Sequence, residues 1–194
     1  MIKNKWKVAF VVLAVTVVIA VIALFISLRS ILPEAEEVPY TKSERTNEQG
    51  LVEIHSTKAQ LNELILEATS EFQEETPYTV ELLSDTVEFQ STFRLLGQSI
   101  PITIDFDPEV AANGDLLLQA DSLSFGFLTI PSEQAMQLVK SHTELPDWIV
   151  VHPSDSLIEV QLTNARFDDL YSFRVIDFDL ARDEIQVEMF INRD

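Results

Sequence analysis

The stretch SIPITIDFDPEVAANGDLLLQADSLSF, residues 99–125, decides the fold of this chain. In its first half apolar and polar side chains alternate, which is the period of a β-strand that buries one face. Asn113-Gly114 follows as a turn signal, and a second strand-like run begins directly after it. The stretch therefore predicts two long antiparallel strands joined by a turn.

Strand-like runs continue on both sides of this hairpin. They cover residues 51–55, 78–83, 86–96, 148–152, 157–162, 172–181 and 184–191. Short strands that follow one another along the chain, with turn residues between them, are typical of an antiparallel meander. The pattern therefore predicts one long antiparallel sheet.

Two segments have the period of a helix instead. In residues 56–72 apolar side chains recur at helical spacing, and Thr57 with Gln60 fits a capping box. A second, shorter helix is expected from Pro131 to about Ser141, because proline suits the first turn and Glu133 favours the positive end of the helix dipole. The expected fold class is α+β, a long curved antiparallel sheet with two helices packed on one face.

The N-terminal part has the composition of a membrane anchor. Residues 8–28 carry no charge, and 21 residues of helix span roughly 30 Å, the thickness of a bilayer core. Lys3, Lys5 and Lys7 precede this segment, so the positive-inside rule places the N-terminus in the cytoplasm and the remainder outside the cell. A cleaved signal peptide is the alternative, although the apolar segment is long for one and ends in FISLRS.

These features predict four regions. They are a basic cytoplasmic tail (1–7), a transmembrane helix (8–28), a polar stalk (29–49) and an extracytoplasmic α+β domain (50–194). From residue 30 onward nine basic residues face 32 acidic ones, a balance of −23. Such a domain repels nucleic acid, which proteins bind mainly by neutralising phosphates.

The tetrapeptide IDFD occurs twice, at 104–107 and 176–179, and its paired aspartates invite a metal or catalytic interpretation. Asp105, Asp107 and Asp115 could form a loose calcium site, but the segment lacks the glycine and the final glutamate of an EF-hand. Strand alternation offers a simpler account. It places Ile102, Ile104 and Phe106 opposite Thr103, Asp105 and Asp107, and Ile176, Phe178 and Leu180 opposite Asp177 and Asp179.

The residues that catalysis needs are sparse. There is no cysteine, and the four glycines form no nucleophile elbow or phosphate-binding loop. His55, His142 and His152 lie at the expected boundaries of helices and strands, far apart in sequence. We therefore expect no enzyme, no catalytic residue, no metal and no cofactor.

Several segments carry a family resemblance. The basic start with its single span, Leu61-Asn62, GQSIPITIDFDPEVAANGDLLLQADSLSFGFLTIP (97–131) and LPDWIVVHP (145–153) resemble the YpmS family of low-GC Gram-positive bacteria. The resemblance implies a membrane-anchored extracytoplasmic protein and carries no established activity. The pattern is also distantly similar to tubular lipid-binding domains of bacterial envelopes, although the chain is too short for a full tube.

Some of the strands are apolar on both faces, which leaves two interpretations. One is a strongly curved sheet with two ordinary cores. The other is an apolar groove between sheet and helices that binds a lipid or another apolar envelope ligand. The residues expected to line such a groove are Phe106, Phe125, Phe127, Leu128 and Trp148. The alternative function is an acidic protein-interaction module, an accessory subunit for a cell-envelope enzyme.

Overall fold

A computed structural model describes residues 16–17, 19, 40–42, 50–69, 78–95, 98–125, 131–143, 145–167 and 170–191. The chain divides into two compact units, Met1–Glu34 and Ala35–Asp194. In the first unit Thr16, Val17 and Ile19 are helical, and the rest of the predicted span 8–28 lies outside the described residues. Within the described part of the chain, no helix has the length and apolar character needed to cross a membrane.

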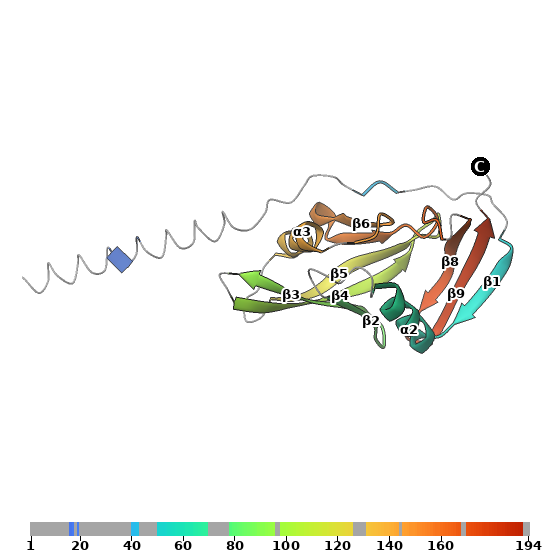
Figure 1. Cartoon of the computed structure of the whole chain (residues 1–194), viewed down its shortest axis with the longest axis horizontal. Coiled ribbons are helices and arrows are strands. Elements are labelled where there is room, and N and C mark those ends of the chain that lie inside the picture. Colours follow the sequence, from blue (N-terminus) through green and yellow to red (C-terminus); the bar gives the residue numbers. More distant parts are fainter. Residues whose placement is uncertain are drawn as a thin grey trace, which may run out of the picture. The chain divides into compact units, whose positions relative to one another are not determined.

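The described strands of the second unit form two antiparallel sheets (Figure 1). The larger sheet has the order β2-β3-β4-β5-β7-β6 and the smaller one β1-β9-β8. The larger contains β2 (Tyr78–Leu82), β3 (Val87–Leu95), β4 (Gln98–Val110), β5 (Leu116–Phe125), β7 (Leu157–Val160) and β6 (Ile149–His152). The smaller contains β1 (Val52–Ser56), β9 (Glu184–Ile191) and β8 (Tyr171–Asp179).

The prediction of a single long sheet was therefore wrong, although the α+β class is confirmed. β1 pairs with β9, the last described strand, in the register Val52↔Met189 to Ser56↔Ile185. The first and last strands of the domain thus belong to a sheet that is separate from the central meander. Alternation within a strand tells which face is buried, but it contains no information on a partner strand at the other end of the domain. The nine strands that the structure describes lie where the sequence predicted them.

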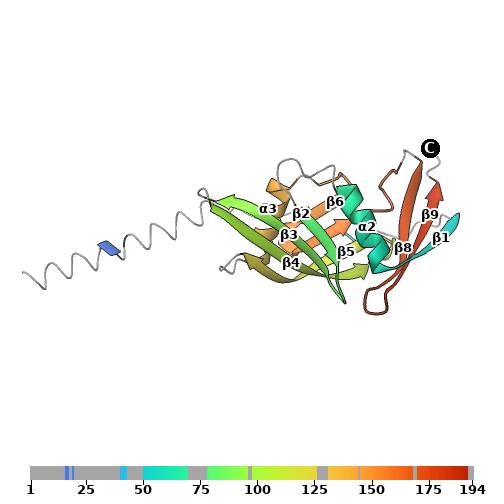
Figure 2. The ribbon, with the colours of Figure 1, turned by 60° about the horizontal axis from the view of Figure 1, so that its bottom comes forward.

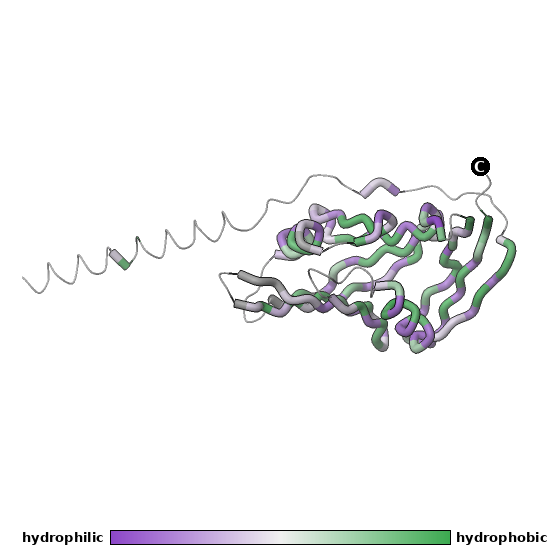
Figure 3. The backbone as a smooth tube through the Cα atoms, in the orientation of Figure 1, coloured by the Kyte–Doolittle hydropathy of each residue, from purple (hydrophilic) through white to green (hydrophobic). Residues whose placement is uncertain are grey.

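The central hairpin is confirmed. β4 and β5 pair from Ile102↔Phe125 to Val110↔Leu116, and Gly114 adopts a φ of 94° in the turn between them. Ile102, Ile104 and Phe106 are 0%, 0% and 1% exposed, whereas Asp107 on the other face is exposed. Figure 3 shows the resulting alternation of apolar and polar residues along the strands. The first IDFD copy is thus an amphipathic strand.

The second IDFD copy differs from its prediction at one residue. The register between β8 and β9 shifts between Val175 and Asp177, so Ile176 is bulged and 42% exposed. Leu180 is buried as expected, and Phe178 is half-buried. The prediction that Ile176 lies on the same face as Phe178 and Leu180 was wrong. Ile176 is the extra residue of the bulge, so its side chain does not follow the alternation of the strand.

The larger sheet is curled, and its two edge strands β2 and β6 lie on opposite sides of a common interior (Figure 2). Inward-facing residues continue from strand to strand through the pairs Val87↔Phe106, Leu118↔Ile158 and Ile149↔Val160. These side chains are all apolar, so the sheet presents a continuous apolar concave face. Such a face must be covered to be stable in water.

Two helices lie over this interior. α2 (Lys58–Thr69) begins with the predicted capping box, in which the Thr57 N–H donates to Gln60 Oε1 (3.0 Å) and the Gln60 N–H to Thr57 Oγ1 (3.4 Å). α3 (Ser132–His142) confirms the second predicted helix and buries Ala135, Met136 and Val139 almost completely. α2 has no buried residue, so the two helices cover the sheet in different ways.

The two sheets meet at Arg174 of β8. Its backbone neighbour Val175 donates an N–H to the carbonyl oxygen of Gly114 (2.8 Å), which lies in the β4–β5 turn. The Arg174 side chain is buried, packs over the Phe190 ring at 5.4 Å, and its Nη1 lies 3.6 Å from Glu188 Oε2. A Cβ on Gly114 would overlap Arg174 Cγ, so this junction requires glycine.

Gly114→Ala should destabilise the domain for two reasons. The positive φ costs an alanine about 1–3 kcal/mol, and the new methyl group displaces Arg174. Chemical unfolding followed by circular dichroism measures the loss. In an Arg174→Ala background the same substitution should cost less, because only the backbone part remains. Equal costs in the two backgrounds would show that Arg174 is not the obstacle.

Candidate functional site

The concave interior contains a cavity of about 270 Å³. Its walls come from α2, the larger sheet, α3, the segment that follows α3, and β8. The lining residues are Leu61, Ile65, Ala68, Thr69, Tyr78, Val80, Leu82, Val87, Phe89, Phe106, Leu116, Leu118, Val139, Leu145, Pro146, Trp148, Ile149, Ile158, Val160, Leu162 and Phe178. The helices therefore cover the sheet without filling the space between them and it.

The lining is almost without polar groups. None of these residues carries a charge, and only Thr69, Tyr78 and Trp148 have a side-chain hydrogen that can be donated. Thr69 donates its hydroxyl to the carbonyl oxygen of Ile65 at 2.7 Å. Trp148 is half-buried, and its ring lies 5.9 Å from that of Phe167. The cavity thus suits an apolar ligand, and its described lining offers no counter-charge for an ionic one.

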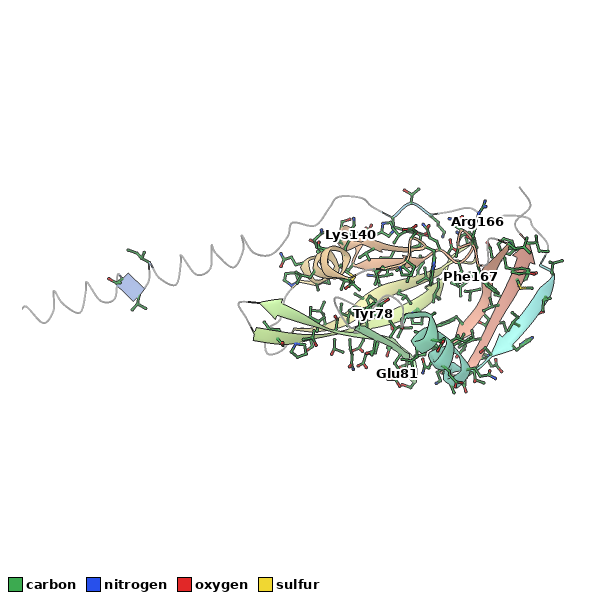
Figure 4. The ribbon with its side chains drawn as sticks, viewed as in Figure 1. Tyr78, Glu81, Lys140, Arg166 and Phe167 are labelled. Carbon is green, nitrogen blue, oxygen red and sulfur yellow. The ribbon has the colours of Figure 1, made fainter. Side chains whose placement is uncertain are left out.

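Tyr78 brings a buried polar group to this otherwise apolar lining. Its side chain is 3% exposed and its ring stacks on Phe89, with centroids 5.7 Å apart. Among the described residues the hydroxyl has no hydrogen-bond partner, and burial raises the pKa of this phenol above its usual value. In Figure 4 Tyr78 lies on the interior side of β2, whereas Glu81 lies at the outside. The phenol therefore remains protonated, and its O–H is an unused donor.

Helix α2 is the wall that is held least by packing. The Asn62 side chain donates to the Leu82 carbonyl (3.2 Å) and accepts the Leu82 N–H (2.8 Å), which extends the hydrogen bonding of the edge strand β2. At the start of the helix, Lys58 donates its N–H to Asp183 Oδ1 and its Nζ to the Leu180 carbonyl, both at 2.7 Å. Polar contacts thus position α2, while Leu61, Ile65 and Ala68 line the cavity.

The predicted groove residues are brought together only in part. Phe106 and Trp148 line the cavity. Phe125 ends β5, but its side chain, like Phe127 and Leu128, lies outside the described residues. Sequence reasoning missed the contribution of α2. The helical spacing of Leu61, Ile65 and Ala68 was visible, but not the fact that this apolar stripe faces a cavity.

Two of the singled-out aspartates, Asp179 of the second IDFD copy and Asp115 of the suggested calcium site, make hydrogen bonds that serve the fold. Asp179 accepts the backbone N–H of Arg182 (2.8 Å) and its Nε–H (2.7 Å), and these two bonds lower the pKa of Asp179. Asp115 is 0% exposed and accepts from Asn113 Nδ2, the Thr163 N–H and the Thr163 hydroxyl at 2.6–2.9 Å. Within the described residues, no three His, Asp or Glu side chains are grouped to hold a metal ion.

Two histidines have described side chains, His55 in β1 and His152 at the end of β6, and of these only His152 is buried. His152 Nε2 lies 3.3 Å from Glu159 Oε2, and Gln161 donates to the same oxygen at 3.0 Å. The Tyr40 ring packs edge-on against His152 at 5.7 Å, and the Tyr40 N–H donates to Asp155 Oδ2 (2.7 Å). This cluster lies outside the cavity lining and joins part of the predicted stalk to the folded unit.

Fold and site together define an α+β domain in which a curled antiparallel sheet and two helices enclose an apolar cavity. The family model described as "Uncharacterized protein conserved in bacteria (DUF2140)" matches residues 4–191, and the chain belongs to this family. It is 30% identical to "Uncharacterized protein YpmS" of Bacillus subtilis (strain 168) over 189 residues. These residues make up 96% of this chain and 97% of that protein. The resemblance to the YpmS family is thus confirmed. No solved structure matches the chain significantly.

Asn62→Ala removes both hydrogen bonds between α2 and the backbone of β2. The free energy of unfolding should fall by about 1–3 kcal/mol. Relative to the parent protein, the exchange of amide hydrogens with deuterium should speed up more in α2 than in β4. Glu63→Ala, at the next and exposed position, is the matched control and should change stability by less than about 0.5 kcal/mol. If both substitutions had the same small effect, the Asn62 contacts would not hold the helix.

Proposed function

We propose that this chain is a membrane-tethered, non-enzymatic extracytoplasmic module that binds a lipid or another apolar envelope ligand in the cavity. One observation carries the proposal, namely a cavity of about 270 Å³ whose described lining is uncharged. Pockets for small molecules measure roughly 300–1,000 Å³ and are mainly apolar with few polar groups. A volume just below that range suits a single apolar chain.

The energetics favour occupancy. Each methylene group that leaves water for an apolar site contributes about 0.8 kcal/mol, and an empty apolar cavity loses the dispersion contacts of the side chains around it. A chain lying along the sheet therefore stabilises the folded domain as well as itself. The described lining has no charged side chain that could serve as a catalytic acid or base, which favours binding over chemistry.

The tether is proposed from the sequence of residues 8–28, with Lys3, Lys5 and Lys7 on the cytoplasmic side. An anchored domain stays near the bilayer, where lipids and lipid-linked precursors are concentrated. The acidic balance of the chain after residue 29 disfavours anionic polymers as ligands, in agreement with an uncharged site.

Ligand binding is testable through Trp148, which lines the cavity. In the full-length chain held in a lipid-free amphipathic polymer, Trp6→Phe leaves Trp148 as the single tryptophan. Chains labelled with bromine should quench its fluorescence saturably. Ala68→Phe inserts a ring into the cavity and should weaken this binding at least about ten-fold, because the ring occupies the space of the ligand.

Leu66→Phe is the matched control. It introduces the same side chain into the same helix at a position that is exposed, as Ala68 is, but Leu66 does not line the cavity. This variant should bind as the parent does. Quenching that is unsaturable, or that is equally strong in the Ala68→Phe variant, would count against an apolar ligand in this cavity.

A second candidate function, a protein-interaction module that serves an envelope enzyme, is favoured by one specific observation. β1 is an edge strand of the smaller sheet; Leu51 just before it is 55% exposed, and Val52 and Ile54 in it are 48% and 39% exposed. Edge strands with exposed apolar residues can take up a strand from a partner. The acidic balance after residue 29 would favour a basic partner surface.

A photoreactive amino acid at Val52 tests this candidate in cells. A crosslinked adduct of one defined mass should form there and weaken as ionic strength rises, while the same label at the exposed Thr79 of β2 should give none. The Ala68→Phe variant should still form the adduct, since the cavity is not involved. Labelling that is equal at both positions would reject β1 as the partner surface.

A further inference from the structure

The polar character of the ligand can be inferred from Tyr78, in an argument that rests on the proposed function. A buried hydroxyl without a partner is unusual, because leaving such a group unsatisfied costs about 1–3 kcal/mol. Tyr78 Oη is buried and has no partner in the part of the chain that the structure describes, and the residue lines the cavity. A hydrogen-bond acceptor on a bound ligand would satisfy this hydroxyl.

The position of the Tyr78 ring is determined by its contacts in the sheet and not by its hydroxyl. It pairs with Ser91 of β3, its inward neighbours on β2 are Val80 and Leu82, and its ring stacks on Phe89 at an interplanar angle of 25°. A phenylalanine would satisfy all of these contacts. The oxygen therefore has no evident role in packing, and a role in recognition accounts for it.

The charge of the ligand follows from what surrounds the hydroxyl. The described lining has no Lys, Arg or His that could neutralise a buried carboxylate or phosphate. A single neutral donor does not offset the desolvation of a full charge. The high pKa of the Tyr78 phenol keeps it a donor throughout the physiological pH range. An uncharged acceptor such as an ester carbonyl is compatible with this site.

We propose that the cavity binds a neutral acyl ester, whose hydrocarbon chain contacts the apolar walls and whose carbonyl oxygen accepts a hydrogen bond from Tyr78 Oη. The Tyr78 hydroxyl makes the cavity selective for ligands that carry an acceptor, and the apolar walls of the cavity supply most of the affinity. Free fatty acids, ionised at neutral pH, are disfavoured by the lack of a counter-charge.

Three brominated probes of matched chain length separate these contributions. They are bromododecane, ω-bromolauric acid and its methyl ester, each titrated against the Trp148 fluorescence of the full-length Trp6→Phe chain at neutral pH. Tyr78→Phe should weaken the methyl ester about five-fold, the loss of one neutral hydrogen bond. Its affinity for bromododecane should not change. The ratio of parent to variant for each probe is the readout, so differences in the solubility of the probes cancel.

Stability provides the control for folding. Tyr78→Phe removes an unpartnered polar atom and keeps the ring, so the unfolding midpoint of the ligand-free chain should not fall. If the ester and the hydrocarbon respond equally to Tyr78→Phe, or if the carboxylate binds more tightly than the ester, the inference is overturned while apolar binding stands. If no probe quenches Trp148 saturably, both the inference and the proposed function fail.

Discussion

The continuous apolar face of the curled sheet is the constraint on which the rest of the domain depends. It begins at Tyr78, Val80 and Leu82 on one edge, and the cross-strand pairs extend it to β6 on the other. A curved surface of this width cannot be left in water. α3 covers part of it by burying Ala135, Met136 and Val139, whereas α2 covers another part without burying any residue fully. The cavity is the space that these two kinds of cover leave open.

The junction of the two sheets shows how the chain ends are tied to this face. Glu188 Oε1 accepts the Gly50 N–H at 3.0 Å, and its other oxygen reaches Arg174, which packs over Gly114. A Cβ at Gly50 would overlap Glu188, as one at Gly114 would overlap Arg174. Two glycines far apart in sequence thus allow two charged side chains to approach the backbone. Through this junction β8 contributes Phe178 to the cavity wall.

Much of the fold was predictable because its signals are local. Ile102, Ile104 and Phe106 alternate with polar residues, Asn113-Gly114 marks a turn, and Thr57 with Gln60 caps a helix. The pairing of β1 with β9 was not predictable, since the sequence of neither strand indicates which other strand it pairs with. The exposure of Ile176 depends on a one-residue bulge, which alternation alone cannot reveal. Phe106 and Trp148 were found for the site by their size and apolarity. Ala68 and Tyr78 were not, because their importance lies in space left empty and in a hydroxyl left unbonded.

The attachment of α2 would affect the rate at which a ligand of the proposed kind enters and leaves the cavity. A segment held by a few hydrogen bonds opens with a smaller free energy than a strand in the middle of a sheet. Leu64 and Leu66 face solvent at 62% and 64% exposure, so displacing the helix exposes little apolar surface beyond the stripe that faces the cavity. A bound molecule could then leave without unfolding of the sheet. Its residence time would be set by the local opening of one helix, while its affinity would depend on all of the walls, α2 included.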